Sequence, residues 1–99
     1  MIGTTELDSA LTGLLRDDGD GLAWAHLAAN GSRVSLWAGP GYHWLQVFTG
    51  DPLGPDLRRK SVAIEPMTCP PNAFVTGQDL LVIQPGDEIS HTWGIKADL

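Results

Sequence analysis

Glycine and proline divide this chain into short segments along its whole length, and this feature restricts the fold more than any other. The 99 residues include 12 glycines and 7 prolines. Between them lie short runs of β-branched and aromatic residues, which are typical of strands joined by turns. The sequence therefore predicts an all-β fold, an antiparallel β-sandwich, with residues 1–99 in one domain.

The clearest local signal is the pair Asn30-Gly31, since both residues tolerate the positive φ of a type I′ hairpin turn. The segments around it alternate or are rich in apolar residues, so they are expected to pair as strands. Residues 9–16 are the one stretch that could form a short helix, although they lack a sustained apolar stripe. The expected strands are residues 22–28, 33–38, 42–49, 61–65, 80–84 and 89–95, the last two joined by a turn at 85–87.

Charge and composition exclude several classes of function. Six basic and 12 acidic residues give a net charge of -6, which argues against nucleic acid as a partner because phosphate binding needs a basic surface. No apolar run approaches the roughly 20 residues of a membrane span, and the start of the chain lacks a signal peptide pattern, so a cytoplasmic protein is expected. The lone Cys69 excludes an internal disulfide and a cysteine-rich zinc site.

Three polar residues lie within or beside apolar segments, where a site built on strands would place them. Gln46 interrupts an apolar run, Glu65 ends a short run just before Pro66, and Asp8 lies in the segment ELDSAL, residues 6–11, among apolar residues. A carboxylate at a strand end, next to a rigid proline, is well placed to act as a general base. From the pattern alone, the simpler interpretation of Glu65 is a solvated strand terminus.

Four segments in the same order resemble the aldose 1-epimerase (mutarotase-like) family. Residues 63–74, AIEPMTCPPNAF, are similar to its glutamate motif, and residues 79–87, DLLVIQPGD, to the turn of its final strand pair. Residues 44–50, WLQVFTG, resemble a third element and residues 7–12, LDSALT, a fourth. The resemblance implies that the chain is the C-terminal part of a mutarotase-like supersandwich.

The resemblance also implies roles for the polar residues. Glu65 matches the general base that takes the proton from the anomeric hydroxyl, while Gln46 and Asp8 match residues that bind sugar hydroxyls. The family's acid is a histidine in earlier strands, before the part that this chain matches. We therefore expect an incomplete and inactive fragment. Ser9 and Leu11 depart from the family's histidine and aromatic residue, which puts the contacts beside Asp8 in doubt.

The implied activity is the interconversion of α and β anomers of an aldohexose such as galactose, or recognition of a hexose phosphate. No metal or organic cofactor is expected, because two positioned proton-transfer groups suffice. Two alternatives stay open, a non-catalytic carbohydrate-binding module and a structural interaction domain. Unpaired strand edges would favour a homo-oligomer. His26, His43 and His91 are expected at the surface, and Trp44 could stack on a sugar.

Overall fold

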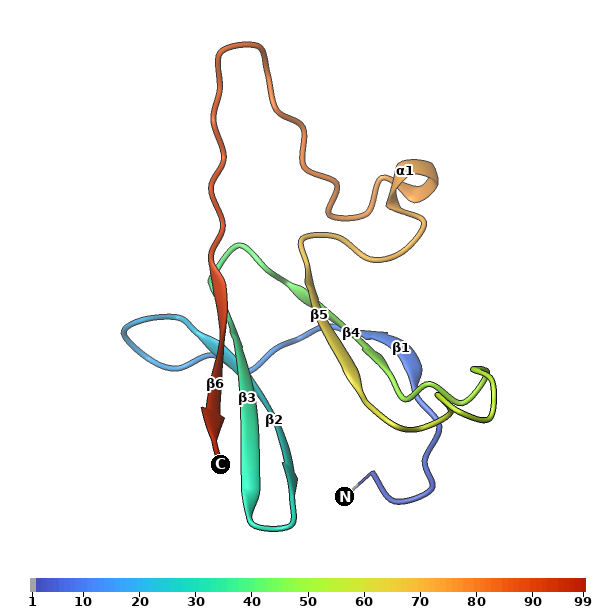
Figure 1. The fold of residues 1–99 in the computed structure, drawn as a ribbon. Helices are drawn as coiled ribbons and strands as arrows, with labels where there is room; N and C mark the ends of the chain where they lie inside the picture. The colour runs from blue at the N-terminus through green and yellow to red at the C-terminus, as the bar shows by residue number, and fades with distance from the viewer. Residues whose placement is uncertain (1) are drawn as a thin grey trace.

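The computed structural model describes residues 2–99 and contains two three-stranded antiparallel sheets (Figure 1). The first sheet has the order β1-β4-β5, and the second has the order β2-β3-β6. The all-β, antiparallel fold class predicted from the sequence is thus confirmed. The first sheet consists of β1 (Asp8–Leu11), β4 (Trp44–Phe48) and β5 (Ala63–Met67), and the second of β2 (Ala23–Ala29), β3 (Ser32–Ala38) and β6 (Trp93–Asp98).

A small apolar core lies between the two sheets. Leu36 and Ala38 of β3 and Leu45 of β4 are buried in one cluster, and Ile64 of β5 packs against it. Since successive side chains of a strand point to opposite faces, each sheet turns one face to this core and the other outward. Residues 46 and 65 therefore lie on the outward face of the first sheet, and residues 24, 26 and 35 on that of the second.

The hairpin predicted at Asn30-Gly31 is confirmed. Both residues have positive φ, 52° and 80°, as a type I′ turn requires. The turn joins β2 to β3, in which Ala29 is opposite Ser32 and the register continues to Ala23 opposite Ala38.

The short strand expected to stop before Pro66 continues through it, and β5 reaches Met67. This is possible because β5 is an edge strand, paired with β4 alone, with Pro66 opposite Leu45. A proline has no N–H to give to a ladder, and an edge position can leave that donor out.

Two other expectations are wrong. The possible helix at residues 9–16 does not form, because residues 8–11 pair with β4 as the edge strand β1. The segment 80–84 is not a strand, and β6 begins only at Trp93 although a strand was expected from residue 89. The turn between them does form, with the Asp87 N–H donating to the Gln84 carbonyl at 3.0 Å. A strand needs a hydrogen-bonding neighbour, and residues 80–92 lack a ladder partner among the described residues.

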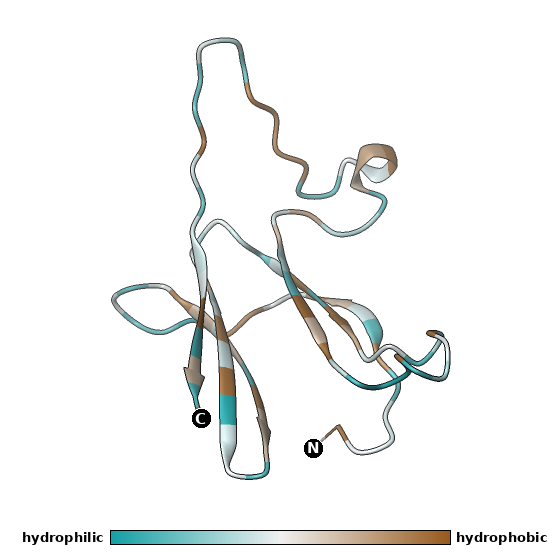
Figure 2. Ribbon diagram, viewed as in Figure 1, coloured by the Kyte–Doolittle hydropathy of each residue, from teal (hydrophilic) through white to brown (hydrophobic). Residues whose placement is uncertain are grey.

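Residues 78–92, which we call the arm, run away from the two sheets (Figure 1). The arm follows the single-turn helix α1 (Ala73–Thr76). It contains an apolar stretch (Figure 2), in which the exposed fractions of Leu81, Val82 and Ile83 are 47%, 70% and 58%. The radius of gyration is 15.5 Å, against about 13 Å for a compact domain of this length. The molecule is therefore elongated.

Within residues 2–99, no helix has the length and apolarity needed to cross a bilayer.

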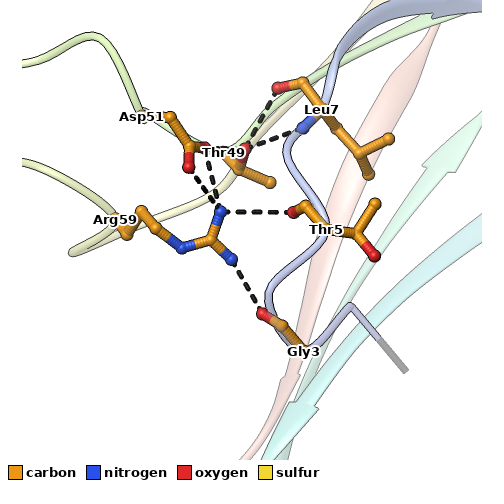
Figure 3. Close-up of polar contacts among 6 residues, drawn as sticks. All are labelled: Gly3, Thr5, Leu7, Thr49, Asp51 and Arg59. Atoms are coloured by element: carbon orange, nitrogen blue, oxygen red, sulfur yellow. Dashed lines mark hydrogen bonds and ion pairs between the residues drawn. The ribbon is translucent and has the colours of Figure 1, made fainter.

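One connection in the first sheet is held by a network of polar side chains (Figure 3). Arg59 donates from Nη1 to both carboxylate oxygens of Asp51, at 2.9 and 2.8 Å, and to the Thr5 carbonyl at 3.2 Å. Its Nη2 donates to the Gly3 carbonyl at 2.8 Å. The buried Thr49 hydroxyl accepts the Leu7 N–H at 2.9 Å and is also hydrogen-bonded to Asp51. These contacts tie the start of the chain to the loop that follows β4.

A second arginine links the loops around the second sheet. Arg16 donates from Nη1 to the carbonyls of Gly21 and Gly39, at 2.9 and 3.2 Å, and from Nη2 to the carbonyl of Tyr42. These three acceptors belong to the turn before β2 and to the connection between β3 and β4. A single guanidinium, with five donors in a fixed plane, therefore fixes the connection that carries the chain from one sheet to the other.

Candidate functional site

The register of the first sheet brings Gln46 and Glu65 together. They are direct cross-strand partners of β4 and β5, so their side chains leave the same face of the sheet at neighbouring positions. Gln46 is half-buried on the central strand, whereas Glu65 on the edge strand is exposed. The Glu65 carboxylate is therefore exposed to solvent. It lies beside the Gln46 amide, because the pairing of β4 with β5 places the two residues opposite each other.

Asp8 joins the same group from the third strand. Gln46 is opposite Ala10, and Asp8 lies two residues before Ala10 and thus on the same face. The Gln46 side chain donates from Nε2 to Asp8 Oδ1 at 2.8 Å. Three residues that are far apart in sequence thus form one row across β1, β4 and β5. Their roles remain predictions.

The Gln46 amide has one unsatisfied atom. Its Oε1 is buried and has no hydrogen-bond partner among the described residues. A buried acceptor without a donor costs about 1–3 kcal/mol. Because this atom has no exposed surface, a ligand on the outward face would reach it only if the amide turned. The row therefore offers two exposed carboxylates, those of Asp8 and Glu65, as acceptors for hydroxyl groups.

Trp44 extends the same face by two residues along β4. Its position is opposite Met67, next to the pair formed by Gln46 and Glu65. The indole Nε1 donates to Asp79 Oδ2 at 2.8 Å, which fixes the orientation of the ring. Asp79 has a positive φ of 51° and stands at the start of the arm. Asp79 was not among the residues predicted from the sequence, since nothing local connects it to a tryptophan 35 residues earlier.

His26 and His43 are exposed at the surface, as expected from the sequence, whereas His91 is half-buried. His26 contacts Ser35 on the second sheet. The backbone carbonyl of His43 accepts a bond from Thr12, and the His91 ring lies 5.5 Å from that of Tyr42. Within the described part of the chain, the histidines make no hydrogen bond to Glu65 or Gln46. In residues 2–99, no group of three or more His, Cys, Asp or Glu side chains is arranged to hold a metal ion.

Comparison with known proteins yields one partial relative. Over 43 residues, 43% of this chain, the sequence is 49% identical to the uncharacterized protein YihR of Escherichia coli strain K12. The match covers 13% of that protein, so the chain corresponds to a minor part of its length. No protein-family model matches the chain. No solved structure matches it either. The comparisons thus show partial similarity to YihR, while the family membership suggested by the motifs remains a proposal.

Proposed function

We propose that this chain is the C-terminal part of an aldose 1-epimerase-like domain, and that it provides the general base and two hydroxyl-binding groups of a hexose site. The observation that supports this best is the row on the first sheet, in which Gln46 is bonded to Asp8 and directly opposite Glu65. The motif resemblance assigns roles to these same three residues, although they lie on three separate strands.

In the proposed reaction, the Glu65 carboxylate takes the proton from the anomeric hydroxyl, and an acid gives a proton to the ring oxygen. The pyranose ring opens, the C1 carbonyl rotates, and the ring closes as the other anomer. Asp8 and Gln46 hold neighbouring hydroxyls, so that the anomeric hydroxyl lies beside Glu65. Trp44, fixed by Asp79, supports the flat face of the sugar ring.

The chain has a candidate base but lacks an identified acid beside it. A positioned acid or base typically contributes about 10²–10⁴-fold in rate. With Glu65 alone, the chain should bind a sugar and change its anomer slowly at best. Binding without turnover is also what a carbohydrate-binding module would show. The open row, with Asp8 and Glu65 both exposed, is compatible with that second function.

The test is a titration of the ¹⁵N-labelled chain with glucose and with galactose. Amide signals of residues 8, 46 and 65 should shift, and Gln46→Leu should abolish these shifts. Glu65→Gln should retain these shifts, because the glutamine amide has the same shape as the carboxylate. The loss of the proton acceptor should affect turnover and not binding. If neither sugar shifts these signals, the proposed site is wrong.

Polarimetry separates the catalytic proposal from simple binding. Mutarotation by the 99-residue chain should stay near the uncatalysed rate. In a longer protein that also supplies the acid, Glu65→Gln should remove about 10²-fold or more of the rate while sugar binding persists. Rapid turnover by the chain alone would show that one of its own residues is the acid. An unchanged rate in Glu65→Gln of the longer protein would favour a binding module.

A further inference from the structure

The outward face of the second sheet carries a group of side chains that the proposed function does not use. Trp24 and His26 of β2 point to this face, together with their cross-strand partners Trp37 and Ser35 of β3. Lys96 of β6 is opposite Ser35 and continues the row. Because Leu36 and Leu45 turn toward the core, this face and the Glu65 face lie on opposite sides of the sandwich.

Hydrogen bonds hold the two aromatic rings of β2 in position. The Trp24 indole donates from Nε1 to Asp17 Oδ2 at 3.1 Å. His26 Nδ1 lies 2.7 Å from the hydroxyl of Ser35, which is only 1% exposed. The Trp24 and His26 rings are stacked, with centroids 6.0 Å apart and an interplanar angle of 10°. A ligand that contacts these rings would meet side chains that are already ordered, which reduces the entropy lost on binding.

These side chains line a hollow of about 360 Å³. It is bounded by Asp17, Trp24, His26, Arg33, Ser35 and Lys96. The volume is at the lower end of the range for small-ligand sites, about 300–1,000 Å³. The hollow combines aromatic carbon surface with a carboxylate, a hydroxyl, an imidazole and two cationic side chains.

The charges around the hollow favour an uncharged ligand. Arg33 and Lys96 both lie near the same carboxylate, with nitrogen–oxygen distances of 3.6 and 4.0 Å to Asp98. Asp17, which also lines the hollow, adds a second negative charge, and the whole chain carries -6. The positive charges of Arg33 and Lys96 are thus partly neutralised by Asp98. The hollow therefore lacks the net positive charge that binding of a phosphate group requires.

We propose that this hollow binds an uncharged saccharide ring. The apolar face of a pyranose packs on the Trp24 indole, a flat carbon surface of matching size. Its hydroxyls find an acceptor in Asp17 and donors in Arg33 and Lys96, while His26 offers the ring nitrogen Nε2 that does not contact Ser35. The site shares no residue with the Glu65 row, so it does not require a free anomeric hydroxyl.

The test uses methyl α- and β-glucopyranosides and maltotriose as probes of the ¹⁵N-labelled 99-residue chain. The methyl glycosides have no free anomeric hydroxyl, so they are not substrates for anomer exchange at Glu65. At millimolar concentrations they should shift the amide signals of residues 24, 26, 33, 35 and 96. Trp24→Ala should weaken this binding by about tenfold or more. Glu65→Gln should leave it unchanged, and Trp44→Ala, on the other face, is the matched tryptophan control.

Two further variants protect against misfolding of Trp24→Ala. Trp24→Phe keeps an aromatic ring but loses the bond to Asp17, and His26→Gln keeps a polar group but loses the second ring. Both should weaken binding less than Trp24→Ala. Three outcomes would overturn the proposal: no shifts with any of these sugars, shifts restricted to the Glu65 face, or shifts of the same residues by inorganic phosphate at lower concentration than by the glycosides.

Discussion

Two long connections between strands of this protein are held in very different ways. Residues 49–62 join β4 to β5, and residues 68–92 join β5 to β6. In the first, the Arg59 guanidinium bonds Asp51 and the carbonyls of Gly3 and Thr5, and the Thr49 hydroxyl is buried beneath it. In the second, residues 81–90 are exposed throughout, including several large apolar side chains.

The comparison shows that the order of a connection depends more on the groups that its side chains can bond than on its amino-acid composition. The first connection is polar and contains two prolines, so its sequence resembles a flexible loop. The second contains an apolar run with the composition of a strand. A few well-placed side chains fix the first connection, whereas residues 81–90 of the second have no ladder partner among the described residues. Exposed apolar surface favours association, and the homo-oligomer expected from the sequence stays a prediction that sedimentation velocity can test.

The largest effect should come from the same substitution made in the core that the first connection follows and in the arm. Leu45 precedes the first connection and is 6% exposed in the core, whereas Leu81 in the arm is 47% exposed. Leu45→Ala should lower the free energy of unfolding by about 3 kcal/mol. Leu81→Ala should change it by less than about 0.5 kcal/mol. Urea denaturation followed by tryptophan fluorescence measures both, and equal losses would show that the arm is packed after all.

A smaller effect is expected from removing one hydroxyl in each connection. Thr49 is 2% exposed and accepts the Leu7 N–H at 2.9 Å. Thr49→Val keeps the shape but leaves that donor unpaired, which should cost about 1–2 kcal/mol. The matched control is Thr92→Val, at an exposed position in the second connection. A destabilisation of similar size in both variants would contradict the difference between the two connections.

The smallest effect concerns acid stability. The hydrogen bond from Thr49 holds the pKa of the Asp51 carboxyl below its ordinary value of 3.8, with burial acting in the opposite direction and Arg59 adding to the decrease. A carboxyl whose pKa is lower in the folded state stabilises the fold above its unfolded pKa, and this contribution disappears as the pH falls through the folded pKa. Thermal melts between pH 7 and about pH 2 should therefore fall less steeply for Asp51→Asn than for the wild type.

In this pH series, the exposed Asp87→Asn in the second connection is the control and should follow the wild-type curve. If the melting temperatures of the wild type and Asp51→Asn fell equally steeply at acid pH, the Asp51 carboxyl would not contribute to stability through its lowered pKa.

Much of the fold was predictable because its signals are local. Asn30-Gly31 specifies a hairpin through the positive φ of its two residues, and the pattern of residues 33–38 specifies which side chains face the core. Gln46 was a candidate because it interrupts an apolar strand, whereas Asp8 and Glu65 were candidates through the family resemblance, and the roles of all three remain predictions. The geometry of the row, however, follows from the register, which places Gln46 opposite Glu65 and beside Asp8.

Where strands can form and which side chains share a face follow from the sequence, because both depend on backbone preferences within a few residues. Which candidates became strands depends on long-range pairing in the folded chain. Residues 8–11 joined β4, and residues 80–84 remained unpaired, because ladder hydrogen bonds require a neighbour that is distant along the chain. The bond of Trp44 to Asp79, 35 residues apart, belongs to the same class. It depends on where the folded chain brings separate segments together.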